Sequence, residues 1–358
     1  MSDTQKHTKS NVPNLRFPGF EGKWKNVKIK DVCRIATGNK NTQDKEDDGR
    51  YPFYVRSQKV EHINSWTFDG DAILTAGDGV GVGKVFHYST GKIGVHQRVY
   101  ILSDFKCNGR YLFYYFSSRF FDRVKRMSAK NSVDSVRMEM IAEMPLALPD
   151  IEEQIKIGIL LSMIDERIAI QNKVIEKYES LIKALAHEII GKHASNIMLS
   201  ECVHCASSTL KESDLAEAGA VPAYGAAGIS GFTDSALSDG DSILITKDGS
   251  GVGSLRYVSG LHSFVGTLNS MTPKDGIYLP YIYYALQNVC FETYRTGQAI
   301  PHIYFRDYGK EAIYCPAYDD QKRLAKRLEL LDAKIGIERA VLRNLQSAKA
   351  FLLSGMFI

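Results

Sequence analysis

The chain has 358 residues, which is enough for two medium-sized domains that each bury a core. Hydrophobic residues make up 44% and charged residues 24%, so the composition excludes a disordered or fibrous protein. No apolar run approaches the ~18 residues of a membrane span, and the polar N-terminus lacks a secretory signal. Six irregularly spaced cysteines fit a reducing compartment. We therefore expect a soluble, cytoplasmic protein, whose net charge of +4 confines any nucleic-acid binding to local basic patches.

A fourteen-residue segment occurs twice in similar form. Residues 71–84 read DAILTAGDGVGVGK and residues 241–254 read DSILITKDGSGVGS, with eight identical positions at a constant offset of 170. Other segments match at this offset over nearly ninety residues. Further along the chain the offset becomes 167, so that Pro149 pairs with Pro316. The chain is therefore predicted to be a tandem duplication.

Heptad periodicity predicts two long helices. Apolar residues alternate at spacings of four and three over roughly 150–190 and again over 317–358, which is typical of a coiled coil. Each seam is interrupted mid-way by a polar residue at the equivalent position, Gln171 in the first helix and Glu338 in the second. A buried polar seam residue fixes register, so we expect the helices to pair antiparallel, with a pseudo-dyad near these residues. The alternative is that each helix packs only against its own globular domain.

The intervening segments, 17–149 and 192–316, are predicted to be mixed α/β. An aromatic-rich helix is expected over 109–127, with a counterpart over 280–294. Short strands are expected at residues 72–75, 84–88, 92–102 and 242–246.

The glycine-rich segment does not form a nucleotide-binding motif. Five residues separate Gly77 from Gly83 where a P-loop has four, and no Ser or Thr follows the lysine. Gly79, Gly81 and Gly83 are evenly spaced, unlike the G-x-G-x-x-G fingerprint. A β-turn in which glycine supplies positive φ is the better interpretation.

Catalytic and metal-binding patterns are not found either. The sequence has no Gly-x-Ser-x-Gly elbow and no Pro-Pro dipeptide, which the motif of an adenine methyltransferase contains. Cys202 and Cys205 flank His204, but no second pair stands at zinc-ligand spacing. We predict no catalytic residue and no metal site, and we interpret these cysteines as ordinary buried thiols.

Together these features resemble the specificity subunit of a type I restriction–modification system. The resemblance covers nearly the whole chain, and each of its motifs is weak alone. It is carried by residues 12–24 (VPNLRFPGFEGKW), 71–84, 144–168 (MPLALPDIEEQIKIGILLSMIDERI) and 315–335. The second helix departs from the pattern, because Asp320-Gln321 stands where the family has Glu-Gln.

The resemblance implies a mixed α+β fold. Two target-recognition domains, each a small α/β globule with irregular sheets, would be joined by two long antiparallel coiled-coil helices in pseudo-two-fold symmetry. The expected bounds are 1–149 for target-recognition domain 1 with an N-terminal extension at 1–16, 150–191 for spacer helix 1, 192–316 for target-recognition domain 2, and 317–358 for spacer helix 2.

The resemblance also implies the function. Each domain would read one half of a bipartite, asymmetric target in double-stranded DNA, while the helix pair sets the spacing and docks two modification subunits. Those subunits would bind S-adenosylmethionine and methylate adenine, and restriction subunits would use ATP and Mg. This chain would hold no cofactor, catalyse nothing and contact no membrane. Two other classes stay open: a self-contained DNA adenine methyltransferase and a coiled-coil protein-interaction scaffold.

Candidate DNA-binding residues are polar side chains where the two copies diverge. The 170 offset places residues 96–98, His-Gln-Arg, opposite residues 266–268, Gly-Thr-Leu. Gln suits adenine and Arg suits guanine in the major groove, so residues 96–98 lead the set. For every candidate, a phosphate contact or a solvated loop position is the alternative. The candidates in domain 1 are Arg56, Ser57, Gln58, Lys59, Lys84, His96, Gln97, Arg98, Arg123 and Arg126. Those in domain 2 are Thr246, Lys247, Arg256, Tyr257, Arg295, Gln298 and His302.

Overall fold

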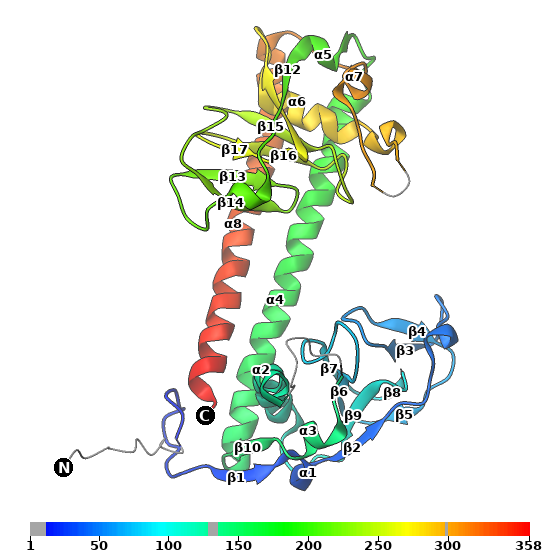
Figure 1. Ribbon diagram of the computed structural model, residues 1–358, viewed down its shortest axis with the longest axis vertical. Helices are drawn as coiled ribbons and strands as arrows, with labels where there is room; N and C mark the ends of the chain where they lie inside the picture. The colour runs from blue at the N-terminus through cyan, green and yellow to red at the C-terminus, as the bar shows by residue number, and fades with distance from the viewer. Residues whose placement is uncertain (1–11, 128–134, 298–299) are drawn as a thin grey trace, which may run out of the picture. The chain divides into compact units, whose positions relative to one another are not determined.

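The computed structural model describes residues 12–127, 135–297 and 300–358. The chain divides into two compact units, the first built from residues 1–171 together with 341–358 and the second from 172–340. Each unit contains a mixed α/β globule and part of each long helix, α4 (Ile151–Ala186) and α8 (Tyr318–Met356), as Figure 1 shows. The predicted fold class is confirmed.

The first unit contains short strands in two larger sheets and one small one. Its strands are β1 Lys25–Lys28, β2 Arg34–Thr37, β3 Tyr51–Tyr54, β4 Glu61–Ile63, β5 Phe68–Asp69, β6 Ala72–Ala76, β7 Phe86–Ser89, β8 Lys92–Val95, β9 Val99–Ser103 and β10 Pro145–Leu148. Its shorter helices are α1 Ile29–Val32, η1 Thr42–Asp44, α2 Gly109–Met127 and α3 Met138–Ala142. The sheet orders are β2-β9-β6-β7, β4-β3-β8-β5 and β1-β10.

Helix α2 connects the first sheet to α4. It packs against β6 and β7 with an apolar face that is rich in buried aromatic rings. Tyr111 is fully buried, and its hydroxyl donates to the carbonyl of Ala147 at 2.5 Å. The Tyr114 hydroxyl donates to the carboxylate of Asp165 on α4 at 2.8 Å. Because buried phenols need acceptors, these two bonds attach α2 to β10 and to α4.

The strand that the sequence predicts over 92–102 is two strands in different sheets. β8 pairs with β3 and β5, whereas β9 pairs with β2 and β6. The chain turns between them, where the N–H of Val99 donates to the carbonyl of His96 at 2.9 Å. Residues 96–98 therefore form a crossing between two sheets, which the apolar pattern alone does not reveal.

The second unit repeats this plan. Its strands are β11 Ile197–Met198, β12 Val203–Ser207, β13 Val221–Gly225, β14 Gly228–Thr233, β15 Ser242–Thr246, β16 Leu255–Val258, β17 Ser263–Phe264, β18 Leu268–Pro273 and β19 Ala312–Ile313. Its helical segments besides α8 and the end of α4 are η2 His187–Gly191, α5 Leu199–Cys202, η3 Glu212–Asp214, α6 Leu279–Ala285, η4 Leu286–Asn288, η5 Phe291–Tyr294 and α7 Phe305–Tyr308. The sheet orders are β12-β18-β15-β16, β14-β13-β17 and β11-β19.

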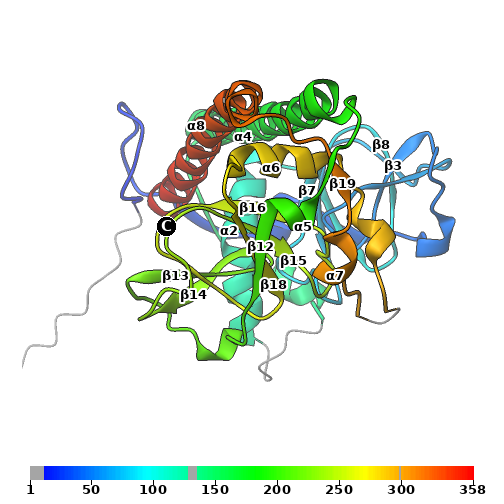
Figure 2. The same cartoon turned by 90° about the horizontal axis from the view of Figure 1, so that it is seen from above.

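The counterpart of α2 is shorter than predicted. The expected helix over 280–294 is α6 followed by the two short turns η4 and η5. Helix α6 packs against β15 and β16 and lies between this sheet and the long helices, as Figure 2 shows. The Tyr284 hydroxyl donates to the carboxylate of Asp332 on α8 at 2.6 Å, which repeats the bond from Tyr114 to Asp165.

The strand register changes one predicted correspondence between residues of the two copies. Ile73 of β6 pairs with Leu102, and Ile243 of β15 pairs with Met271. The offset in this strand is therefore 169, one less than expected. Residues 96–98 correspond to residues 265–267, Val-Gly-Thr, and not to 266–268.

The long helices pair antiparallel in the first unit. Lys349 of α8 forms an ion pair with Asp165 of α4 at 2.6 Å. Earlier in α4, Ile157 shares a buried cluster with Met356 and Phe357. A residue nearer the start of α4 therefore contacts a residue nearer the end of α8, as in an antiparallel pair.

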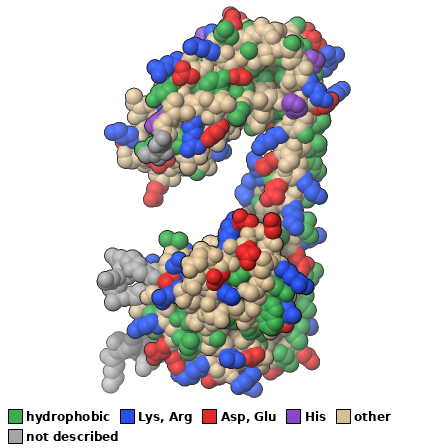
Figure 3. Space-filling view, turned by 90° about the vertical axis from the view of Figure 1, so that its right-hand side faces the viewer, with side chains coloured by type: hydrophobic (Ala, Val, Ile, Leu, Met, Phe, Trp, Pro, Cys, Tyr) green, Lys and Arg blue, Asp and Glu red, His purple; other side chains and the backbone are tan. Residues whose placement is uncertain are grey.

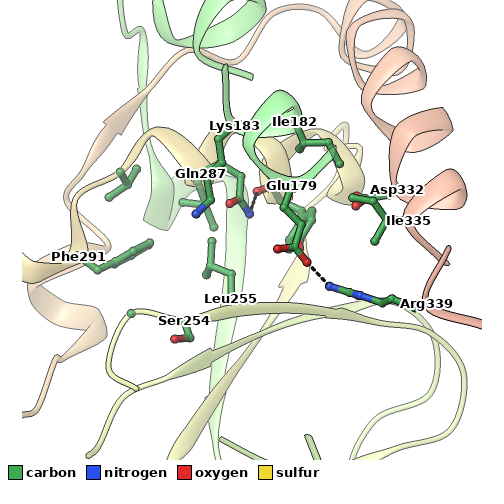
Figure 4. A pocket seen from close by; sticks show the side chains of 14 residues that line it. Glu179, Ile182, Lys183, Ser254, Leu255, Gln287, Phe291, Asp332, Ile335 and Arg339 are labelled. Carbon is green, nitrogen blue, oxygen red and sulfur yellow. Dashed lines mark hydrogen bonds and ion pairs between the residues drawn. The ribbon is translucent and has the colours of Figure 1, made fainter. Parts of the chain in front are cut away.

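The second unit shows the same pairing. Arg339 of α8 forms an ion pair with Glu179 of α4 at 2.6 Å, and Ile335 lies beside Ile182 (Figure 4). These contacts contradict the alternative in which each helix packs only against its own globule. Within the seams Gln171 and Glu338 are half-buried, and their role in fixing register stays a prediction.

A buried glutamine attaches the start of each long helix to its globule. The side chain of Gln154 accepts from the N–H of Asn108 at 2.9 Å and donates to the carbonyl of Pro149 at 2.7 Å. Gln321 repeats both bonds, accepting from the N–H of Tyr278 at 2.8 Å and donating at 2.9 Å to the proline five residues before it. The first turn of each helix is therefore fixed by side-chain bonds to the globule.

Replacing Gln154 by Leu should destabilise the first unit. The substitution leaves one backbone N–H and one carbonyl without their partner, at a cost of about 2–5 kcal/mol. Urea unfolding of the full chain measures this loss. The matched control is Gln346→Leu, at an exposed position of α8, which should stay within about 0.5 kcal/mol of wild type. Equal effects of the two substitutions would contradict the anchoring role.

Candidate nucleic-acid interface

The glycine-rich turns after β6 and β15 have the same backbone conformation. Positive φ angles occur at Gly79 (77°), Gly83 (66°), Gly249 (95°) and Gly253 (85°). These angles lie in the left-handed region that glycine adopts readily, so the predicted turn is confirmed. A Cβ on Gly253 would lie 2.6 Å from the Cβ of Phe291, so this turn also packs closely against the segment after α6.

In the first unit, the glycine-rich turn contacts two arginines from other loops. Asp78 forms an ion pair with Arg56 Nη1 at 2.8 Å and another with Arg98 Nε at 3.6 Å. The arginine side chains are 46% and 65% exposed, while that of Asp78 is 26% exposed. The structure thus brings together two predicted residues from separate loops and adds Asp78, which the prediction missed. Its identity with Asp248 in the repeat is the signal that could have found it.

His96 differs from its two neighbours because it is buried. Its ring Nδ1 accepts from the backbone N–H of Arg98 at 3.0 Å, and the backbone N–H of His96 donates to the carbonyl of Tyr54 at 3.0 Å. Burial and the nearby Arg56 lower the pKa of His96, so the neutral ring is favoured. Gln97 is exposed and its amide donates to the Asn41 side chain at 2.6 Å. His96 therefore supports the loop from within, whereas Gln97 and Arg98 reach solvent.

The other loop candidates of the first unit are exposed. Ser57, Gln58 and Lys59 lie between β3 and β4, where the Ser57 hydroxyl donates to the carbonyl of Lys59 at 3.0 Å. Lys84 ends the glycine-rich turn, with its ammonium 5.5 Å from the ring centroid of Phe121. All four side chains are exposed, three of them in the loop between β3 and β4 and one between β6 and β7.

The arginines of α2 have a mainly structural setting. Arg123 donates from Nε to the carbonyl of Met140 at 2.8 Å, and burial lowers its pKa. Arg119 donates to the carbonyl of Phe357 at 2.9 Å. Arg126 is exposed and lines, with the other two, a groove of about 560 Å³. Any contact from this face of α2 to a DNA phosphate would thus rest mainly on Arg126.

Two candidates of the second unit, Lys247 and His302, meet at its glycine-rich turn, where the N–H of Ile303 donates to the carbonyl of Lys247 at 2.9 Å. Thr246 is buried in β15, and Lys247 is half-buried where the turn begins. His302 contacts Asp248 through Nδ1 at 2.6 Å. Thr246 is the last residue of β15 and is buried, so its side chain does not reach the surface.

Three further candidates lie on β16 and near η5. Arg256 is exposed, and the Tyr257 hydroxyl donates to Asp241 at 2.7 Å. Arg295 forms an exposed ion pair with Glu292 at 2.5 Å. Gln298 lies outside the described residues.

A groove of about 460 Å³ lies beside the helix pair in the second unit (Figure 4). Asp332 lines it, and burial raises the pKa of its carboxyl above the usual value. The equivalent Asp165 has Lys349 as an ion-pair partner, but the counterpart of Lys349 at offset 167 is Ile182. The second unit thus places an apolar residue where the first has a compensating cation.

Positive and negative side chains are mixed on the surface, and the described residues include neither a metal-binding group nor a membrane-spanning helix. Figure 3 shows Lys and Arg interspersed with Asp and Glu over the face that it presents. Among the described residues, no group of His, Cys, Asp and Glu is arranged to hold a metal, and Cys202 is a buried free thiol. No helix in that part of the chain is long and apolar enough to span a bilayer.

Comparison with known proteins adds the family. The family model of the type I restriction modification DNA specificity domain matches residues 21–180 and again residues 201–347. The two matches together cover more than half of the chain and repeat with the duplication. The chain therefore belongs to the type I restriction–modification DNA specificity family.

Individual relatives are distant. The EcoDI type I restriction enzyme specificity subunit of Escherichia coli is 25% identical over 167 residues, which are 47% of this chain and 37% of that subunit. The chain thus matches little more than a third of that relative. A protein named as a type I specificity subunit in Mycoplasma pneumoniae is 24% identical, over 66% of this chain and 69% of its own.

Solved structures share the fold. The S subunit of a type I restriction–modification system from M. genitalium superposes with a TM-score of 0.67 at 20% identity, covering 97% of this chain and 99% of that one. A chain from a structure on complex assembly and conformational transition of the type I R-M system gives 0.50 at 14% identity, over 95% and 98%.

Replacing Gly253 by Ala should be more harmful than replacing Gly249 by Ala. Both glycines have positive φ, so each substitution costs about 1–2 kcal/mol in backbone strain. A Cβ on Gly249 meets nothing within 4 Å, whereas one on Gly253 overlaps Phe291 and should cost at least about 1 kcal/mol more. Thermal unfolding of the two variants measures the difference. Identical losses would show that close packing at Gly253 is unimportant.

Replacing Asp332 by Asn should change how stability depends on pH. The folded-state pKa of Asp332 is raised, so its contribution is fully present below the unfolded value near 3.8 and is lost as pH rises through the folded value. The stability of wild type relative to Asp332→Asn should therefore fall as pH rises from below the unfolded value through the folded value. Unfolding midpoints of both proteins across this range test the sign. A difference that is constant or rises with pH would contradict the burial effect.

Proposed function

We propose that this chain is the DNA sequence-specificity subunit of a type I restriction–modification complex. The observation that carries the proposal is one framework, present twice, with different side chains around the same turn. Asp78 is paired with Arg56 and Arg98, whereas its counterpart Asp248 contacts His302. Two recognition units that share one framework but carry different side chains fit a DNA target whose two halves differ in sequence.

In this proposal each unit reads one half of a bipartite target in double-stranded DNA. Half-sites that face the same side of the duplex are ~34 Å apart, or a multiple of that distance. A helix of 36 residues such as α4 is about 54 Å long at 1.5 Å per residue, so the helix pair can set a fixed gap.

Direct contacts to bases and phosphates come from the side chains that reach solvent. In the first unit these are Arg56, Ser57, Gln58, Lys59, Lys84, Gln97, Arg98 and Arg126. In the second unit Arg256 and Arg295 are exposed, and Lys247, Tyr257 and His302 are half-buried. Arg98 and Gln97 are the leading base readers, since their side chains can pair with guanine and adenine edges in the major groove.

The helix pair also offers surface for the partner subunits. Large apolar side chains with more than a third of their surface exposed occur along both helices: Ile151, Ile155, Ile159, Met163, Ile170 and Leu181 on α4, and Leu330, Ile337, Val341 and Phe351 on α8. Exposed apolar side chains in such number indicate a surface that another protein covers. We assign it to two modification subunits.

The chemistry belongs to the partners in this proposal. The modification subunits bind S-adenosylmethionine and methylate adenine, and restriction subunits use ATP and Mg. This chain supplies recognition and spacing, holds no cofactor of its own and works in the cytoplasm.

Mapping methylated adenines tests the function. The chain is co-expressed with its modification subunit in a host that lacks other methyltransferases. We expect one motif with two dissimilar halves and a fixed gap, and we expect that exchanging residues 17–149 for those of another family member changes one half only. A contiguous motif, or none from an assembled complex, would contradict the two-reader function. Adenine methylation by the chain alone would instead indicate a self-contained methyltransferase.

DNA binding at two salt concentrations distinguishes the specificity subunit from a protein-interaction scaffold. Proteins that contact phosphates lose DNA affinity steeply as salt rises. The complex should therefore bind target duplex less tightly at 200 mM than at 50 mM salt. DNA binding that is absent at both salt concentrations would favour the scaffold.

A further inference from the structure

We propose that Asp78 and Asp248 are positioning residues that determine which side chains each unit presents to its half of the DNA target. This inference rests on the proposed function and deepens it, because it assigns part of the difference between the half-sites to the different partners that one repeated aspartate holds in each unit. The two aspartates stand at the same position of the repeated turn, after β6 and β15.

Asp78 lies between two cationic side chains that come from different loops. Arg56 follows β3, and Arg98 lies in the crossing between β8 and β9. The Asp78 carboxylate accepts from Arg56 Nη1 at 2.8 Å with one oxygen, and its other oxygen lies 3.6 Å from Arg98 Nε. One carboxylate therefore compensates the repulsion between two guanidinium groups that would otherwise separate in solvent.

The backbone of Arg98 is fixed independently of this ion pair. Its carbonyl accepts from the N–H of Gly77 at 2.7 Å, and its N–H donates to the buried ring of His96 at 3.0 Å. What remains free is the long side chain, which is 65% exposed. Asp78 removes part of that freedom, and a side chain that is already ordered loses less entropy when it binds.

The ion pair also leaves the arginines able to bind DNA. A guanidinium has five N–H donors, and the contact to Asp78 involves Nε of Arg98 and one terminal nitrogen of Arg56. Pairing with the O6 and N7 atoms of guanine needs two donors. The cluster of Arg56, Arg98 and Asp78 therefore keeps a net charge of +1 and spare donors at an exposed position.

The second unit uses the same aspartate with a different partner. The counterparts of Arg56 and Arg98 are Ala226 and Thr267, neither of which is cationic. His302 instead forms a β-bridge with Asp248 and contacts its carboxylate through Nδ1 at 2.6 Å. The counterpart of His302 in the first unit is Ser135. The side chains that contact the repeated aspartate thus come from different positions in the two units.

The test uses the complex of the full chain with its modification subunit and duplexes that carry the methylated motif. Affinity for the intact target is compared with affinity for duplexes in which either half alone is scrambled. Asp78→Asn should lower discrimination at the half that residues 17–149 read by at least about fivefold, the smaller effect expected for a lost bidentate base contact. Discrimination at the other half should stay unchanged, and Asp248→Asn should give the reverse pattern.

Two further variants separate positioning from general stability. Asp71→Asn is the matched control, because Asp71 lies before β6 in the same unit and accepts from the Tyr88 hydroxyl at 3.2 Å. It should leave discrimination at both halves unchanged. Arg98→Lys keeps the charge but loses the planar fork, and it should lower discrimination at the same half as Asp78→Asn.

Several outcomes would overturn the proposal. One is wild-type discrimination by the Asp78→Asn complex, which leaves the two-reader function intact. Another is an equal loss at both halves, which indicates a structural defect. A wild-type complex that distinguishes neither half would overturn the proposed function together with this inference.

Discussion

The antiparallel apolar seam between α4 and α8 is the contact on which both units depend. In the first unit it brings Phe357 against Tyr111 and Tyr115, with ring centroids 5.5 and 5.6 Å apart. The core of that unit is therefore completed by residues from the far end of the sequence. In the second unit the buried Ile182 and Ile335 contribute in the same way. Because burial of such side chains is the main favourable term in folding, the globules and the helix pair stabilise one another.

A small set of polar bonds then fixes α2 and α6 within each unit. The hydroxyls of Tyr111 and Tyr281 donate to the carbonyls of Ala147 and Tyr314 at 2.5 and 2.8 Å. Tyr114 and Tyr284 each add an equivalent bond to an aspartate of a long helix, at 2.8 and 2.6 Å. These groups sit in the helices that are repeated, while the loops that differ lie at the strand ends. Recognition can therefore diverge without disturbing the framework.

The sequence predicts this framework better than the surface that it carries. The heptad spacing and the repeat offset report apolar burial directly, and they yield α4, α8 and the duplication. The break between β8 and β9 escapes prediction because Ile93, Val95, Val99 and Ile101 are all buried, although two sheets share them. Burial of His96 and Thr246 depends on neighbouring sheets, and so does the meeting of Arg56 with Asp78. These contacts link separate loops, and residue spacing along the chain does not encode them.

The discontinuous make-up of the first unit has a consequence for biosynthesis. The second unit is one uninterrupted stretch, residues 172–340, whereas the first needs residues 341–358 to cover its aromatic cluster. In a nascent chain, Tyr111 and Tyr115 thus lack the ring of Phe357 until the whole second unit has been translated. Domains generally fold in the order of synthesis, but here the N-terminal unit is the last to be completed. A chaperone that shields uncovered aromatic side chains would therefore act mainly on the N-terminal unit.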